Sequence, residues 1–311
     1  MIIQYILLVI VRYKFVSFYF IFSYPLFPAE LHNYQQSTIN YQLSTISKKM
    51  ENWLLLVISG LFAGILAGLL GIGGGTVLVP ILLAFEYTML QATATSSLAI
   101  VITATSGTIQ NWRMGYIDFK KVVFLALPAA FTAYFAAGIA KFIPPKNQLV
   151  SFGILLLFTI YLVELRKKLS KKQEEAAENE QNQQNQESKI GSVVSRIITG
   201  GLAGMLAGIF GVGGGVIMVP LQMLLLAEPI KKAIQTSLGV IVISSISSAS
   251  RHAIEGNILF AEGLILGFGG LLGAQLSTRF LPKLPDQVVS LTFRAGLAIL
   301  AAYVFWKAYN I

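Results

Sequence analysis

The chain has 311 residues, of which 55% are hydrophobic and only 12% are charged. Soluble domains carry about 25% charged residues, so this composition indicates a protein that lies within a lipid bilayer. With no cysteine and only two histidines, the sequence lacks the ligands for a cysteine or histidine metal centre. The net charge of +9 does not indicate nucleic-acid binding, because the Lys and Arg residues gather at the ends of apolar runs. We therefore expect the bilayer as a partner and no nucleic acid, metal or cofactor.

The first 49 residues stand apart from the rest of the chain. Residues 1–28 are apolar and aromatic, and residues 33–46 are polar and repetitive. The apolar run has no basic opening and no small-residue cleavage site, which argues against a signal peptide. We hypothesise that Met50 is the native start and that residues 1–49 are a dispensable extension, with an extra apolar helix as the alternative.

From residue 52 the apolar runs follow one another in a repeated order. A helix needs about 20 apolar residues to cross the hydrocarbon of a bilayer. We therefore predict an all-α polytopic membrane protein of about eight transmembrane helices, with one repeat at 50–165 and a second at 191–311. The runs lie at 53–70, 76–85, 89–112, 122–140 and 148–165, and then at 193–210, 216–227, 233–250, 258–280 and 287–306.

A polar segment at 166–190, rich in Glu, Gln, Asn and Lys, separates the repeats. It has no apolar periodicity, so we expect a disordered connector in the cytoplasm. If the first, interrupted run of each repeat crosses the membrane once, the repeats have four crossings each and are parallel. If that run is re-entrant, they have three each and are inverted. The pattern leaves both open, although the Lys and Arg residues favour cytoplasmic termini.

A glycine cluster interrupts the first run of each repeat, at 71–75 and again, 140 positions later, at 211–215. Aligning residues 60–80 with 200–220 gives 12 identities in 21 positions, which indicates an internal duplication. A glycine cluster breaks a helix, and irregular backbone at membrane depth is tolerated only where it is buried in protein or lines a cavity. Paired broken helices of this kind are typical of transporters whose substrate site lies where the two breaks meet.

A half-helix beginning at Thr76 or Val216 would direct free N–H groups and its positive dipole end at an anion. Pro80 and Pro220 are expected within its first turn or so, where proline disrupts least. A nucleotide site is disfavoured, because no Lys-Ser/Thr follows the glycines. The other interpretation is close helix packing, which we favour for the glycines at 60, 64 and 68 and at 200, 204 and 208. The substrate-binding candidates of the two breaks are Gly73, Gly74, Gly75, Thr76, Gly213, Gly214 and Gly215.

Two further polar pairs recur with a spacing of 141. Hydroxyls of the first pair can donate to an oxyanion, or they can bond back to their own helix. The second pair falls near a helix end, where a solvated interface is the alternative to substrate binding. The candidates are Thr95 and Ser96 with Thr236 and Ser237, and then Asn111 with His252, together with Arg251.

No Asp or Glu falls at the centre of a predicted crossing. Proton-coupled carriers commonly place an acid there, whereas an inside-negative potential already drives anions outward by about 2.3 kcal/mol per charge per 100 mV. The absence favours potential-driven anion efflux.

At the segment 68–80, its second copy at 208–220, and the Thr-Ser elements at 95–96 and 236–237, the chain resembles the TauE/SafE family. The resemblance covers residues 53–306. It implies a multi-pass transporter of the cell membrane that exports sulfite, sulfoacetate or another small sulfur-containing anion. A non-transporting membrane scaffold or assembly subunit is the alternative from another class. An enzyme is disfavoured, because no acid–base pair or nucleophile constellation is visible in the sequence.

Overall fold

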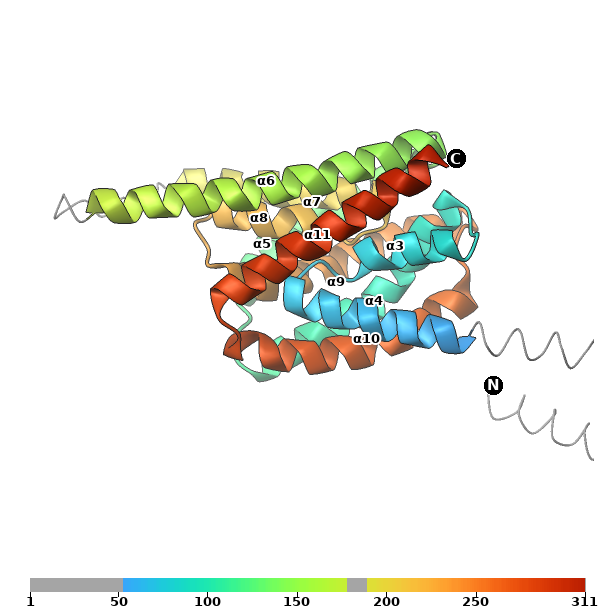
Figure 1. Cartoon of the computed structure of the whole chain (residues 1–311), viewed down its shortest axis with the longest axis horizontal. Helices are drawn as coiled ribbons and strands as arrows, with labels where there is room; N and C mark the ends of the chain where they lie inside the picture. The colour runs from blue at the N-terminus through green and yellow to red at the C-terminus, as the bar shows by residue number, and fades with distance from the viewer. Residues whose placement is uncertain (1–52, 178–188, 311) are drawn as a thin grey trace, which may run out of the picture. The chain divides into compact units, whose positions relative to one another are not determined.

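The computed structural model describes residues 53–177 and 189–310 (Figure 1), so the predicted extension at 1–49 lies outside the described residues. Every regular element in the described part is a helix. After an unlabelled first helix, Trp53–Leu70, the elements are α3 (Gly75–Ala84), α4 (Met89–Arg113), α5 (Phe119–Ala140), α6 (Pro145–Ala177), α7 (Lys189–Phe210), α8 (Gly215–Leu225), α9 (Ile230–Ile254), α10 (Phe260–Phe280), the 3-10 turn η1 (Leu281–Lys283) and α11 (Asp286–Tyr309).

Eight of the described helices are long and apolar enough to cross a membrane, which confirms the all-α membrane fold. The two short helices, α3 and α8, are the half-helices that follow the glycine breaks. Large apolar side chains such as Leu127, Phe131 and Ile299 are exposed on the outside of the bundle. An exposed apolar surface of this extent fits lipid rather than water.

Helix α6 is longer than the sequence indicates. It continues to Ala177, and α7 begins at Lys189, so both ends of the expected disordered connector are helical. The expectation was wrong there because charged and amide side chains such as Lys, Glu and Gln are good helix formers even without an apolar face. Residues 178–188 lie outside the described part.

Close glycine contacts fix the directions of neighbouring helices. Gly60 of the first helix faces the backbone of Leu266 in α10, and Gly68, two turns later, faces Ser277. The first helix and α10 therefore run parallel. In the second repeat, α7 runs parallel to α5 in the same way, because Gly200, Gly204 and Gly208 face Leu125, Ala129 and Ala133 in order. These glycines allow close packing, as expected for residues that lack a Cβ.

The two longest central helices, α4 and α9, run antiparallel. Ser97 lies 3.3 Å from Ser248, measured between the hydroxyl oxygens, whereas Gly107, further along α4, contacts Leu238, earlier in α9. Positions 141 apart in the chain therefore lie in helices of opposite direction. Of the two topologies that the sequence leaves open, the structure shows the inverted one.

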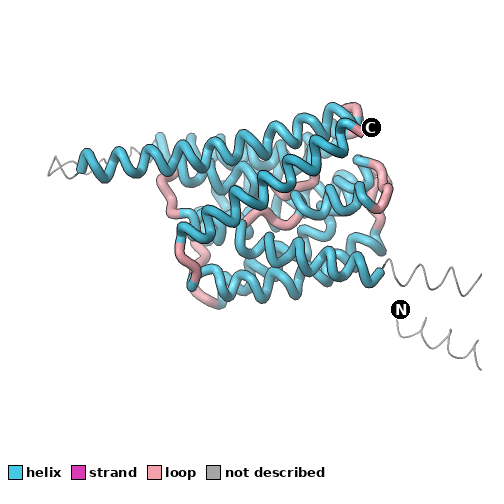
Figure 2. Tube along the Cα trace, viewed as in Figure 1, coloured by secondary structure: helices cyan, strands magenta, loops and turns pink. Residues whose placement is uncertain are grey.

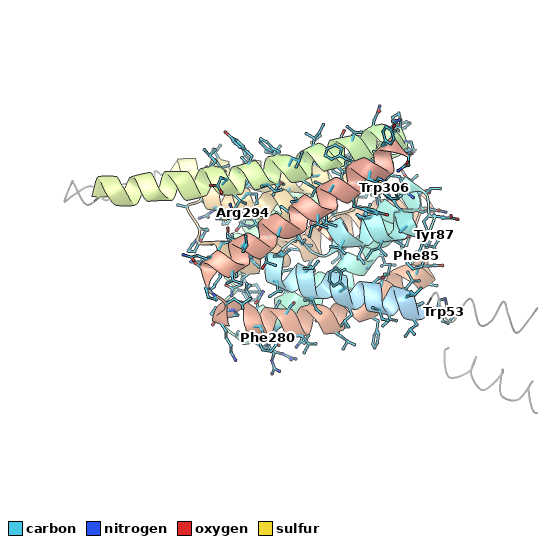
Figure 3. All side chains as sticks on the ribbon, in the orientation of Figure 1. Trp53, Phe85, Tyr87, Phe280, Arg294 and Trp306 are labelled. Carbon is cyan, nitrogen blue, oxygen red and sulfur yellow. The ribbon has the colours of Figure 1, made fainter. Side chains whose placement is uncertain are left out.

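The inverted arrangement places the first and last described helices' outer ends, near Trp53 and Tyr309, away from the linker. Trp53, Tyr87 and Trp306 lie near one end of the bundle, and Phe280 and Arg294 lie near the other (Figure 3). We call these the terminal end and the linker end, because α6 runs towards its last residue, Ala177, at the second of them (Figure 1). The expectation that termini and connector share one side of the membrane is therefore wrong for the described residues. The half-helices fold back, and a count of apolar runs does not reveal that.

Candidate functional site

The glycine breaks reverse the direction of the chain. Gly71, Gly73 and Gly74 have φ angles of 66°, 73° and 82°, and their counterparts in the second break have 64°, 75° and 78°. Side chains with a Cβ rarely adopt this left-handed region. A Cβ on Gly74 would lie 3.2 Å from the carbonyl oxygen of Ala63, which shows that α3 starts alongside the first helix rather than beyond it. Each break therefore forms a hairpin inside the bundle, and Figure 2 shows these loop segments in its interior.

The half-helices begin at Gly75 and Gly215, one residue earlier than expected. Pro80 is consequently the sixth residue of α3, beyond the first turn in which the sequence predicts it, and the same correction applies to Pro220. A proline there removes the intrahelical hydrogen bond to the carbonyl four residues earlier. In α3 that carbonyl belongs to Thr76, inside the candidate site.

The two breaks touch each other in the middle of the bundle. A Cβ on Gly75 would lie 2.6 Å from the Cα of Val212, and a Cβ on Gly215 would lie 2.7 Å from the Cα of Ile72. Only glycine fits at such a backbone-to-backbone approach. The structure therefore brings the glycine candidates of both repeats together at one place.

Ser96 and Ser237 hold the breaks in a reciprocal manner. The Ser96 hydroxyl donates to the carbonyl oxygen of Gly211 at 2.7 Å and shares its hydrogen with the carbonyl of Thr93. The Ser237 hydroxyl donates to the carbonyl oxygen of Gly71 at 2.8 Å. Each repeat thus positions the break of the other, and neither hydroxyl hydrogen is free for a ligand. We describe both serines as positioning residues.

The amide ends of the half-helices have no protein acceptor among the described residues. In α3, Val77 and Leu78 both donate to the carbonyl of Gly74, and in α8, Met218 donates to Gly214. The N–H groups of residues 73–76 and 213–216 make no backbone hydrogen bond in the described part. Helix N-termini with free amides carry partial positive charge and are suited to bind an anion.

Two isoleucines close the space between the breaks. A Cβ on Gly73 would lie 2.9 Å from Cγ2 of Ile241 and 3.2 Å from Cγ2 of Ile100. Both side chains are fully buried, and they form a small apolar cluster with Ala104. Ile100 and Ile241 are 141 positions apart and form a further repeated pair, which no polar signal in the sequence marks.

The remaining polar candidates form no hydrogen bond to residues 71–75 or 211–215 in the described part. The Thr95 hydroxyl accepts a hydrogen bond from the amide of Leu259 at 3.1 Å, at the start of α10. Thr236 is buried beside Ser237. Asn111 and His252 are fully buried. The Asn111 amide group has no hydrogen-bond partner in the described part, whereas the His252 imidazole lies beside the backbone of Gly208, near the end of α7. Each lies 11 residues beyond the central isoleucine of its helix, about 16 Å along the axis. Because α4 and α9 are antiparallel, these two side chains lie at opposite ends of the bundle, too far apart to contact one small anion.

Arg251 is engaged in an ion pair at the terminal end. Its guanidinium lies 2.9 Å from the Glu255 carboxylate and stacks over the ring of Tyr134, and Lys141 pairs with the same carboxylate at 3.1 Å. Burial of the Glu255 carboxyl opposes ionisation, but the charges of Lys141 and Arg251 outweigh it and hold the pKa of Glu255 below its usual value. Arg251 therefore ties the end of α9 to α5.

Comparison with known proteins agrees with this architecture. The model of the family described as "Sulfite exporter TauE/SafE" matches residues 56–304. The chain belongs to the TauE/SafE family. It is 30% identical over 280 residues to the probable membrane transporter protein YunE of Bacillus subtilis (strain 168), which covers 82% of this chain and 98% of that protein. A probable membrane transporter protein of Xylella fastidiosa (strain 9a5c) is 27% identical over 267 residues, with 84% and 97% covered. No solved structure matches the chain. We conclude that this TauE/SafE protein is a membrane transporter.

Proposed function

We propose that this TauE/SafE protein exports a small anion through the point where the two glycine breaks meet. The observation that carries the proposal is the contact between two half-helix N-termini whose amides have no acceptor among the described residues. Both positive dipole ends are buried in the same region, and a negatively charged ligand bound between them would stabilise this arrangement. The family description names sulfite, and we propose sulfite, sulfoacetate or a related sulfur-containing anion as the substrate.

The buried polar side chains support movement driven by the membrane potential. Among the described residues, the buried polar side chains are hydroxyls, amides and one imidazole, with no Asp, Glu, Lys or Arg. A site without a fixed cation binds an anion weakly enough to release it. An inside-negative potential supplies about 2.3 kcal/mol per charge per 100 mV for outward movement.

We further propose that the linker end faces the cytoplasm, the reverse of the expected orientation of the termini. Cytoplasmic loops carry the excess of Lys and Arg. With the directions of the helices known, the cations at the linker end outnumber those at the terminal end. The former are Arg113, Lys120, Lys121, Arg196, Lys231, Lys232, Arg279, Lys283 and Arg294, and the latter are Lys141, Lys146, Arg251 and Lys307.

The proposed function is tested by reconstituting the full chain into liposomes loaded with sulfite. A potassium diffusion potential sets the inside negative, zero or positive, and a sulfite oxidation assay measures efflux. We expect efflux that increases with an inside-negative potential and persists when the pH gradient is abolished. A scaffold or assembly subunit would give no efflux above that of protein-free liposomes, and this result would contradict the proposal.

A further inference from the structure

Three buried hydroxyls around the breaks have no hydrogen-bond partner in the described part of the chain. They belong to Thr76, Thr93 and Ser245, whose side chains are at most 1% exposed. Leaving a buried hydroxyl unpaired costs about 1–3 kcal/mol. Three such groups in one region therefore indicate a ligand that accepts hydrogen bonds.

Thr93 and Ser245 border the second break, and Thr76 follows Gly75, the residue of the first break that packs against the second. A Cβ on Gly211 would lie 2.7 Å from the Cα of Thr93, and a Cβ on Gly213 would lie 3.6 Å from the hydroxyl oxygen of Ser245. Gly75, the neighbour of Thr76 in the chain, packs against Gly211 and Val212. The three hydroxyl-bearing residues thus belong to three different helices, α3, α4 and α9. Thr93 and Ser245 border the segment 211–213, and Thr76 follows the glycine that packs against it.

The matching positions around the first break are apolar. At spacings of 140 and 141, the counterparts of Thr76, Thr93 and Ser245 are Val216, Ile234 and Ala104. Ile234 borders Gly71 as Thr93 borders Gly211, because a Cβ on Gly71 would lie 2.8 Å from the Cα of Ile234. The backbone arrangement is therefore shared by the two breaks, whereas the hydroxyl groups are present at only one of them.

We propose that the anion binds off the centre of the two-repeat arrangement, against the second break. The hydroxyls of Thr76, Thr93 and Ser245 and the free amides at the start of α8 are its donors. This inference rests on the proposed function and specifies the site within it. Several neutral donors converging from different directions suit an oxyanion with three or more oxygens, as sulfite has, better than a halide with no directional acceptors.

The test replaces each hydroxyl by the residue that the other repeat carries, in the variant T76V/T93I/S245A. A matched control, T105V/T159V/S250A, removes three hydroxyls that bond only to carbonyls four residues earlier in their own helices. Both are compared with wild type by the sulfite concentration that half-saturates efflux and by thermal unfolding with and without sulfite. The three single variants are measured as well, in case the triple variant does not fold.

We expect the triple variant to raise the half-saturating sulfite concentration at least tenfold, each single variant two- to fivefold, and the control less than twofold. Without sulfite, the triple variant should be as stable as wild type or more stable, because it loses unpaired hydroxyls rather than hydrogen bonds. Its stabilisation by added sulfite should disappear. Wild-type half-saturation in the variants, with sulfite efflux intact, would overturn the off-centre site alone. Absence of sulfite efflux and sulfite binding in the wild type would overturn the proposed function as well.

Discussion

At the residue scale, Ser96 and Ser237 connect the two repeats through a single hydroxyl each. Each donates across to a carbonyl in the other repeat's break, at 2.7 and 2.8 Å. The sequence predicts the repeated Thr-Ser element either as a ligand for the substrate or as hydroxyls that bond back to their own helix. Spacing alone shows that two positions are equivalent, but it does not show whether a hydroxyl points at a ligand or at a carbonyl.

Ser96→Ala should destabilise the protein. It leaves the buried carbonyl of Gly211 without its donor, which costs about 1–3 kcal/mol. Thermal unfolding in detergent should show a clear decrease in Tm, together with reduced efflux. Ser250→Ala, which removes an exposed hydroxyl bonded to Ile246 of its own helix, is the control and should be nearly neutral. Equal stability of Ser96→Ala and wild type would contradict the positioning role.

Thr93 and Ser245 could not be selected from the repeat pattern, because their counterparts, Ile234 and Ala104, carry no hydroxyl. Polar residues that recur in both halves, such as Ser96 and Ser237, hold the backbone of the two breaks in place. The unshared residues, which distinguish the two breaks, become visible only when the three-dimensional contacts show which side chains border each break.

Glu255 should make stability depend on pH at the terminal end. Its pKa is lowered in the folded protein, so its contribution is present above the unfolded value near 4.5 and is lost as pH falls through the folded pKa. Tm of the wild type should therefore decrease more steeply between about pH 5 and pH 3 than Tm of Glu255→Gln. Parallel curves for the two proteins would show that the pairs with Lys141 and Arg251 contribute nothing.

At the element scale, glycine faces set the distance between parallel helices. Gly204 of α7 lies against the backbone of Ala129 in α5, where a Cβ would come within 2.6 Å of the carbonyl carbon. Gly201, on the same helix, has only a methyl group of Thr132 at 3.9 Å. The sequence predicted this packing correctly, because glycines spaced by four lie on one face of a helix.

Gly204→Ala should separate α7 from α5 and destabilise the protein by about 2 kcal/mol or more, since backbone atoms cannot move aside as a flexible side chain can. Gly201→Ala is the matched control and should be neutral or slightly stabilising, because alanine favours the helix. Thermal unfolding of both variants measures the difference. If Gly204→Ala were as stable as Gly201→Ala, α5 and α7 would not pack as described.

At the scale of the whole molecule, the inverted arrangement follows from the fold-back of α3 and α8. The helices of the described part could be predicted from apolar runs, although α6 extends to Ala177, beyond the end of its run. The direction of the second repeat could not be predicted. A run of ten apolar residues after a break has the same sequence pattern whether the chain continues across the membrane or folds back.

The orientation can be checked by cysteine labelling, since the natural chain has no cysteine. Gly115 and Gly256 are matched loop positions at the linker end and the terminal end, and each has open space around its Cβ position. In intact cells, a membrane-impermeant maleimide should label Gly256→Cys but not Gly115→Cys, and permeabilisation should expose both. The opposite labelling pattern would place the linker outside the cell.

The most direct test of the central claim is sulfite efflux, under an inside-negative potential, from liposomes that contain Gly74→Ala or Gly214→Ala. Both glycines have a left-handed backbone conformation with positive φ, so an alanine there distorts the start of a half-helix. Gly115→Ala and Gly256→Ala impose the same backbone strain far from the breaks and serve as controls. We expect efflux to fall at least tenfold in both break variants and to stay within twofold of wild type in both controls. Wild-type efflux from folded break variants would show that the anion does not pass where the two breaks meet.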